Sequence, residues 1–242
     1  MRFQIIDSNT LFGTHPTHKL DLSVERLLRD MNRHKIAASL TLSTVGVFYG
    51  YVEGNRETLD AAKGNKRLAA VATVNPHNYF GSTEELQDLK AHGFRIFKFY
   101  PGEQGWPVDS AAFGRVLEEL APLNMPIMVN AVLPGEATGI GRMIAGYPAP
   151  VILCSVSGET LGEALAVASA AQNIMVETHE LHVPGALKLL AERIGAKRII
   201  FGSGAPRRSV ASSLYYVLHS ELSDSEKRLA LGGNIKRILE AA

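Results

Sequence analysis

Three ionisable side chains lie at or near the ends of short apolar runs, where parallel strands would bring them to one cavity. They are Asp7, Lys98 and Glu177. A lysine withdrawn from water can have a lowered pKa, and could then act as a base or form a Schiff base, with Glu177 or Asp7 as its charged partner. An ion pair that only fixes loop geometry explains the same residues. We take the three as candidate catalytic residues.

Further polar and aromatic side chains are expected around the same cavity, where they could contact a small molecule. These candidates are Asn9, Asn75, Tyr100, Trp106, Asn130, Ser155 and Arg207. The loop that carries Trp106 could close over a ligand, or the indole could pack rigidly on the rim. Arg207 follows the last apolar run and could bind a phosphate or a carboxylate.

Four histidines lie in two loops that should open on the same face. They are His15 and His18 after the first apolar run, and His179 and His182 after the seventh. Imidazole is a common ligand of zinc, so a metal site built from these four is conceivable. Solvated loop histidines without a ligand role are the alternative.

Eight short apolar runs recur along the chain, and each is followed by a stretch with helical periodicity. The runs are Phe3–Ile6, Ile36–Leu42, Leu68–Val74, Phe94–Phe99, Pro126–Val129, Val151–Cys154, Ile174–Val176 and Arg198–Phe201. They are apolar throughout rather than alternating, which is typical of parallel strands covered on both faces. Ser82 and Ser223 each precede a glutamate by three residues, a pattern that begins helices.

Eight strand–helix units predict an α/β fold, a (β/α)8 TIM barrel, with one domain over residues 1–242. An open doubly wound sheet is the alternative, but the first apolar run is not followed by the glycine-rich motif that binds dinucleotides. In a barrel, the candidate residues above would meet at the carboxyl ends of the strands.

Composition excludes several partners. The net charge is +1 and charged residues make up 20% of the chain, so nothing favours nucleic acid or an anionic membrane surface. The single cysteine, Cys154, fits a reducing compartment. We find no signal peptide and no run long enough to span a bilayer, and we therefore expect a cytoplasmic protein.

Several segments resemble the amidohydrolase superfamily, in the branch of metal-dependent hydrolases that includes decarboxylases and lactone hydrolases. The segments are Ile5–Gly13, Ala72–Pro76, Gly93–Lys98, Phe201–Pro206 and Gly233–Asn234. The resemblance implies a barrel with a divalent metal such as zinc at its C-terminal mouth, where the metal activates water or polarises the substrate.

The positions that the resemblance assigns to metal ligands hold other residues in this chain. They are Asn9, Leu11, Asn130, Ser155 and Gly204. Leucine cannot bind a metal, and an asparagine carbonyl is a poor substitute for imidazole. We therefore expect a degenerate metal site and no cofactor.

Three functions stay open. The chain could bind or convert a small molecule at the C-terminal mouth without the usual metal centre, as a hydrolase or lyase by resemblance. It could be a non-catalytic homologue that serves ligand binding or assembly. It could also be an active hydrolase whose metal has moved to the four loop histidines. A homodimer is expected by analogy with similar barrels.

Overall fold

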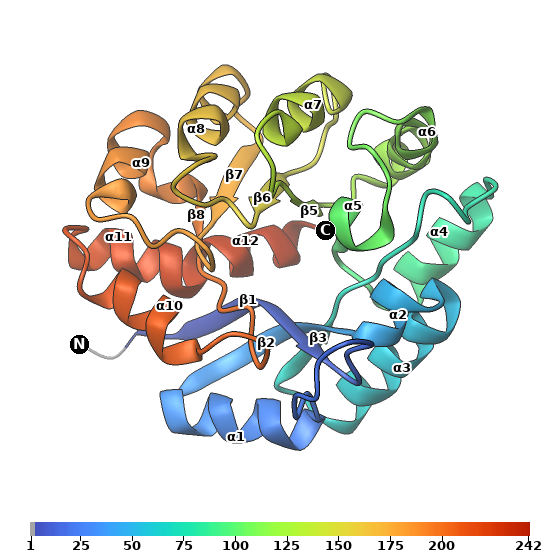
Figure 1. Ribbon diagram of the computed structural model, residues 1–242, viewed down its shortest axis with the longest axis horizontal. Helices are drawn as coiled ribbons and strands as arrows, with labels where there is room; N and C mark the ends of the chain where they lie inside the picture. The colour runs from blue at the N-terminus through green and yellow to red at the C-terminus, as the bar shows by residue number, and fades with distance from the viewer. Residues whose placement is uncertain (1–2) are drawn as a thin grey trace.

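A closed barrel of parallel strands forms the centre of the computed structural model, which describes residues 3–242 (Figure 1). The strands are β1 (Ile5–Phe12), β2 (Ile36–Ser43), β3 (Leu68–Ala70), β4 (Phe97–Phe99), β5 (Ile127–Asn130), β6 (Val151–Cys154), β7 (Ile174–Glu177) and β8 (Ile199–Ile200). They pair in sequence order as β1–β3 and β4–β8. The Lys98 amide donates to Ala72 O at 2.8 Å, and the Ser8 amide donates to Phe201 O at 3.1 Å. These bonds join the two sheets on both sides, and the predicted TIM barrel is confirmed.

Helices surround the barrel. They are α1 (Val24–His34), α2 (Thr44–Phe48), α3 (Tyr51–Gly64), α4 (Thr83–Ala91), α5 (Pro101–Gln104), α6 (Ala111–Leu120), α7 (Glu136–Met143), α8 (Leu161–Ala170), α9 (Ala186–Ile194), α10 (Val210–Leu218), α11 (Asp224–Arg228) and α12 (Asn234–Ala241). Ser223 forms a complete capping box with Glu226 at the start of α11. Ser82 caps α4 through the amide of Glu85, without the reciprocal bond.

The strand bounds differ from the apolar runs where polar residues are buried. β1 begins at Ile5 and continues to Phe12, well beyond the predicted end at Ile6. Its polar residues find partners inside the barrel: the Thr10 hydroxyl, for example, donates to Leu40 O at 2.7 Å. A criterion based on apolar runs cannot detect such a strand. β3 is shorter than predicted, because the chain leaves the ladder after Ala70.

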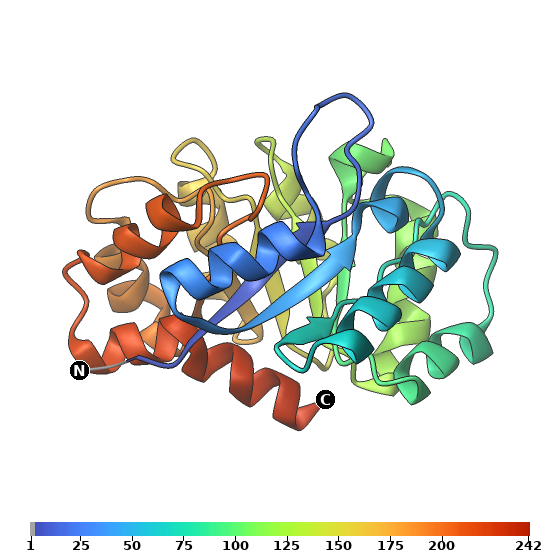
Figure 2. The same cartoon turned by 90° about the horizontal axis from the view of Figure 1, so that it is seen from below.

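Side chains alternate between the barrel interior and the layer beneath the helices. In β4, Phe97 and Phe99 pack in the outer layer, while Ile96 and Tyr100 on either side belong to the inner cluster. Lys98 therefore points inward. The inner cluster is closed at the amino ends of the strands by Ile235 and Ile238 of α12, which lies beneath the barrel (Figure 2). The open end is the mouth formed by the carboxyl ends of the strands.

Over residues 3–242, none of the helices has the length and apolar character needed to cross a membrane.

Candidate functional site

A hydrogen-bonded network in the barrel mouth joins side chains from β1, β4 and β7. The Lys98 ammonium donates to the side-chain oxygen of Asn9. The Asn9 amide nitrogen in turn donates to Glu177 Oε2 at 3.1 Å and lies 3.0 Å from His179 Nδ1. All four side chains are buried, yet Lys98 and Asn9 keep 4% and 5% exposure. The structure thus brings three predicted site residues together with one of the predicted loop histidines.

Within residues 3–242, no acidic side chain lies at ion-pair distance from the Lys98 ammonium. Among the ion pairs of residues 3–242, none includes Lys98. Its nitrogen lies 4.9 Å from the centre of the Tyr100 ring. Burial by itself would lower its pKa, but the neighbouring acidic groups, foremost Tyr100 and then Cys154 and Glu177, keep the pKa above its usual value. Of these groups, Glu177 is the one ionised at neutral pH. A lysine held as ammonium is suited to binding an anion rather than to the nucleophilic role that a lowered pKa would allow.

Glu177 orients the ring of His179. The carboxylate accepts from the His179 backbone amide at 2.7 Å, and His179 Nδ1 lies 2.5 Å from Glu177 Oε2. Burial would raise the pKa of Glu177, but the His179 ring and its hydrogen bonds, with Lys98, hold it below the usual value. An ionised carboxylate only accepts, so Nδ1 carries the shared proton. Nε2 makes no hydrogen bond within residues 3–242, and the carboxylate of Glu180 lies 3.7 Å away, at ion-pair distance.

Asp7 pairs with Ser203 rather than with Lys98. Its carboxyl accepts from the Ser203 amide at 2.9 Å and from the Ser203 hydroxyl at 2.5 Å. Burial, only partly offset by these hydrogen bonds, raises the pKa of Asp7 to about 7. Asp7 is therefore partly protonated at neutral pH. Sequence reasoning missed Ser203, because nothing in the sequence marks a serine that is 196 positions away from its partner.

The raised pKa of Asp7 makes a prediction about stability. Between its ordinary value of 3.8 and about 7, the folded chain holds a proton that the unfolded chain has lost. The free energy of unfolding should therefore fall as pH rises from about 4 to about 7, by up to about 4 kcal/mol. Glu177 acts in the opposite direction and in a lower window: its stabilisation is lost as pH falls below 4.5.

Urea unfolding at several pH values between about 4 and 8 measures this slope. In Asp7→Asn, which keeps the size but does not titrate, the decrease between pH 4 and 7 should disappear. The exposed Asp109→Asn serves as the matched control and should keep the wild-type slope. An unchanged slope in Asp7→Asn would show that Asp7 is not the group responsible.

Two buried polar atoms at the carboxyl ends of β4 and β5 lack a hydrogen-bond partner in residues 3–242. The Asn130 side-chain oxygen and the Tyr100 hydroxyl make no hydrogen bond within residues 3–242. The Asn130 amide nitrogen donates weakly to Glu103, at 3.4 Å and 3.5 Å to its two oxygens. Glu103 on α5 was not among the predicted residues, because it lies in a short helix beyond the strand end. Unpaired buried polar atoms in a mouth point to a ligand that completes their hydrogen bonds.

The remaining residues predicted to contact a ligand are not part of the hydrogen-bonded network around Lys98. Ser155 is buried directly after β6, with φ of 61°. The half-buried Asn75 accepts from the His77 amide and so shapes the loop after β3. Trp106 is 3% exposed, packs on Phe113 with 5.0 Å between ring centres, and donates to Gln104. This environment favours a rigidly packed Trp106 and not a loop that closes over a ligand. Arg207 lies half-buried on the rim after β8.

The four predicted histidines do not converge. The rings of His15 and His18 are tilted against each other with their centres 4.5 Å apart, whereas His182 is exposed beside Tyr216. His179 is 2% exposed, so it is not the solvated loop residue that the alternative interpretation describes. In the part of the chain that the structure describes, no three His, Cys, Asp or Glu side chains are grouped to hold a metal ion.

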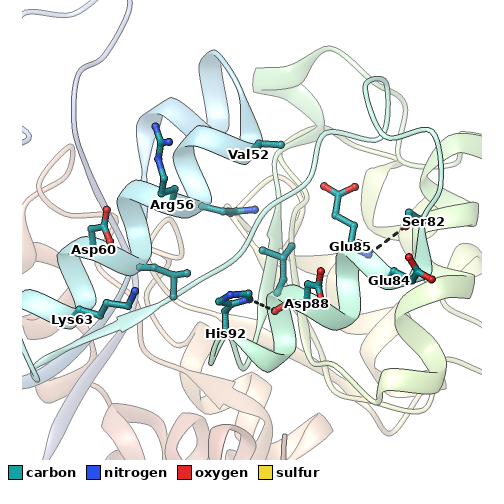
Figure 3. A pocket seen from close by; sticks show the side chains of 12 residues that line it. Val52, Arg56, Asp60, Lys63, Ser82, Glu84, Glu85, Asp88 and His92 are labelled. Atoms are coloured by element: carbon teal, nitrogen blue, oxygen red, sulfur yellow. Dashed lines mark hydrogen bonds between the residues drawn. The ribbon is translucent and has the colours of Figure 1, made fainter.

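A separate groove of about 550 Å³ lies outside the barrel, between α3 and α4 (Figure 3). Arg56 and Lys63 stand on its α3 side, and Glu85 and Asp88 on its α4 side. None of the residues predicted from the sequence to form a site lines it. The chemistry-bearing side chains are in the mouth instead.

Comparison with known proteins agrees with this architecture. The family model described as amidohydrolase matches residues 47–240. The chain belongs to the amidohydrolase family. The resemblance read from the sequence segments is thus confirmed at the level of the family. A search of curated proteins found no match.

Solved structures of three decarboxylases share the fold of this chain. One is 5-carboxyvanillate decarboxylase from Sphingomonas paucimobilis (TM-score 0.78, 14% identity, 99% of each chain covered). Another is 5-carboxyvanillate decarboxylase from Novosphingobium aromaticivorans (TM-score 0.78, 15% identity, 98% of this chain and 97% of that chain). A third is dihydroxybenzoic acid decarboxylase from Polaromonas (TM-score 0.78, 15% identity, 99% and 97%). At these identities the likeness establishes the fold.

The expectation of no cofactor is wrong in the light of these structures. The Novosphingobium protein was solved with manganese and 3-methoxy-4-hydroxy-5-nitrobenzoic acid, and the Polaromonas protein with manganese and 2-nitroresorcinol. A divalent metal therefore belongs among the ligands to test with this chain. The side chains of the mouth do not form a ligand set of three imidazoles or carboxylates, and the Lys98 ammonium would repel a cation beside Asn9.

Proposed function

We propose that this amidohydrolase-family protein binds a small organic carboxylate in the mouth of its barrel, with the Lys98 ammonium as the anchor. The observation that carries the proposal is a lysine with 4% exposure that has no carboxylate within ion-pair distance in residues 3–242. A buried charge without a partner is costly, and an anionic ligand would remove that cost. An ammonium has three donors, and Asn9 accepts from one of them.

The unpaired atoms of Asn130 and Tyr100 narrow the ligand further. The Asn130 oxygen can only accept, so it calls for a donor such as a hydroxyl group on the ligand. A hydroxylated carboxylate would supply an anion for Lys98 and a donor for Asn130. The aromatic hydroxy-acid bound to the Novosphingobium relative supports this class.

Conversion of the ligand is favoured over binding alone by the Glu177–His179 pair. A buried carboxylate that fixes a histidine through Nδ1, with Nε2 not hydrogen-bonded in residues 3–242, is an arrangement suited to proton transfer. In a decarboxylation, the bond between the carboxylate and its carbon breaks and carbon dioxide leaves. The electron pair left on that carbon then takes a proton, which the doubly protonated ring of His179 would donate from Nε2 while Nδ1 keeps its proton and its hydrogen bond to Glu177. We therefore place the reaction among lyases.

Calorimetric titration with salicylate and with its neutral analogue salicyl alcohol tests the proposal, in protein with and without added manganese. We expect saturable binding of salicylate and at least about tenfold weaker binding of the alcohol, because the alcohol offers no charge to Lys98. Equal affinities would contradict the anchor. Release of carbon dioxide from the same samples would show that the protein also decarboxylates the ligand.

We further propose that residues 1–242 act as one domain in the cytoplasm, as a homodimer. The buried, unpaired Cys154 is compatible with a reducing compartment. Size-exclusion chromatography with light scattering tests the dimer.

A further inference from the structure

A hollow on the rim of the mouth carries an unusual share of positive charge. It has a volume of about 460 Å³ and is lined by His18, Lys19, Leu20, Arg207 and Arg208, which we call the rim hollow. The first three residues belong to the loop between β1 and α1, which stands above the mouth (Figure 2). The two arginines follow β8. No acidic side chain lines the rim hollow.

The charges of the rim hollow are mostly uncompensated. Arg208 pairs with Glu180. Lys19 and Arg207 make no ion pair within residues 3–242. His15, in the same loop, has its pKa lowered by burial first and then by the charges of His18 and Arg207. A concave surface with two free cations and a nearby histidine is suited to an anionic group with several oxygen atoms.

Contacts connect the rim hollow to the network in the mouth. Glu180 pairs with Arg208 on one side and lies 3.7 Å from His179 Nε2 on the other. His179 contacts Glu177 and Asn9, and Asn9 accepts from Lys98. Arg208 is thus linked to the buried ammonium through Glu180, His179 and Asn9, and Lys19 and Arg207 line the same hollow as Arg208.

We propose that the rim hollow binds a second anionic group of the ligand, so that the ligand carries an oxyanion at each end. The inference rests on the proposed function, in which Lys98 binds the first carboxylate. The second group is a carboxylate or a phosphate, since both offer the planar or tetrahedral oxygens that guanidinium groups bind. The ligand class is therefore a dicarboxylate or a phosphorylated carboxylate of suitable length.

A series of dicarboxylates tests this inference, with acetate as the single-charge reference. Titration of the wild type with malonate, succinate, glutarate and adipate should show one length that binds at least about tenfold more tightly than acetate, because both ends then find cations. The double variant Lys19→Ala/Arg207→Ala should lose this gain and keep the acetate affinity. Arg193→Ala, which removes a charge in the last turn of α9, is the matched control and should keep the gain.

The outcomes separate the two proposals. A preferred length that persists in the double variant, or that Arg193→Ala removes equally, would overturn the rim site. Inorganic phosphate serves as a second probe: wild-type binding that the double variant loses assigns a phosphate to the rim. If the wild type binds phosphate in this way but no carboxylate, the anchor at Lys98 fails and the rim site stands. If carboxylates bind but neither phosphate nor chain length matters, the rim site fails and the anchor stands.

Discussion

Lys98→Met should abolish the saturable binding of salicylate, with a Kd raised at least about 100-fold. Removing one partner of a buried, hydrogen-bonded charge pair costs about 2–5 kcal/mol, which corresponds to a factor of roughly 30 to several thousand. Methionine keeps most of the length of lysine and can pack against the apolar neighbours of the inner cluster, such as Tyr100 and Met128. The loss should therefore reflect the charge rather than a collapsed mouth.

The stability of the ligand-free variant checks that interpretation. Lys98→Met removes a desolvated ammonium, which stabilises the fold, but leaves the Asn9 oxygen without its donor, which destabilises it. We expect the two effects to oppose each other and the melting temperature to change little. Lys90→Met is the matched control. Lys90 lies in the last turn of α4, donates to Leu123 O and is not part of the mouth network. Salicylate binding by Lys98→Met at wild-type affinity would refute the anchor.

The fold could be predicted from the sequence because the barrel strands are apolar on both faces. The run Val151–Cys154 coincides with β6, and Ile174–Val176 lies one residue short of β7. β1 was misjudged because half of it is polar and still buried, with Asp7 and Asn9 serving the site rather than the core. Local hydrophobicity thus identifies strands that are apolar on both faces and underestimates a strand such as β1, in which half of the buried residues are polar.

The sequence predicts which side chains lie together in the mouth, but not which of them form hydrogen bonds with one another. Lys98, Asn9 and Glu177 were expected in one cavity because strand ends meet there, and the structure brings them together. The closure of the barrel determines which side chains form hydrogen bonds with each other. It brings β1 next to residues almost 200 positions away in the sequence. Asp7 therefore contacts Ser203 instead of a charged partner, and no spacing rule along the chain could reveal this.

The burial of His179 could not be predicted from the sequence either. Its position two residues after a strand, in a loop with proline and glycine, is typical of a solvated histidine. The structure buries it because Glu177 accepts from both its backbone amide and its ring. A carboxylate two residues before a histidine is a weak signal by itself, and it becomes meaningful only when both lie at the mouth.

Gly202→Ala should damage the fold and the site together. Gly202 follows β8 and faces the network: an added Cβ would lie 2.7 Å from Glu177 Cδ and 2.8 Å from Asn9 Cβ, well inside ordinary contact. Both neighbours are buried and hydrogen-bonded, so neither can move without breaking bonds of the network. Overpacking and the lost hydrogen bonds should together cost about 2–4 kcal/mol of unfolding free energy. For a chain of this size, that cost lowers the melting temperature by about 5–15 °C.

Gly162→Ala is the same substitution at another site, and we expect it to increase the stability of the fold. Gly162 lies in α8, and a Cβ built there meets nothing within 4 Å. Alanine at that position should raise stability by up to about 1 kcal/mol through its helix propensity, and it should leave salicylate affinity unchanged. Thermal unfolding and salicylate titration of both variants therefore separate two effects of the added methyl group. At position 162 it only reduces backbone entropy, and at position 202 it displaces Glu177. If Gly202→Ala has the melting temperature and the salicylate affinity of the wild type, the close approach of Gly202 to Glu177 does not hold the site, and Glu177 can move without consequence for His179.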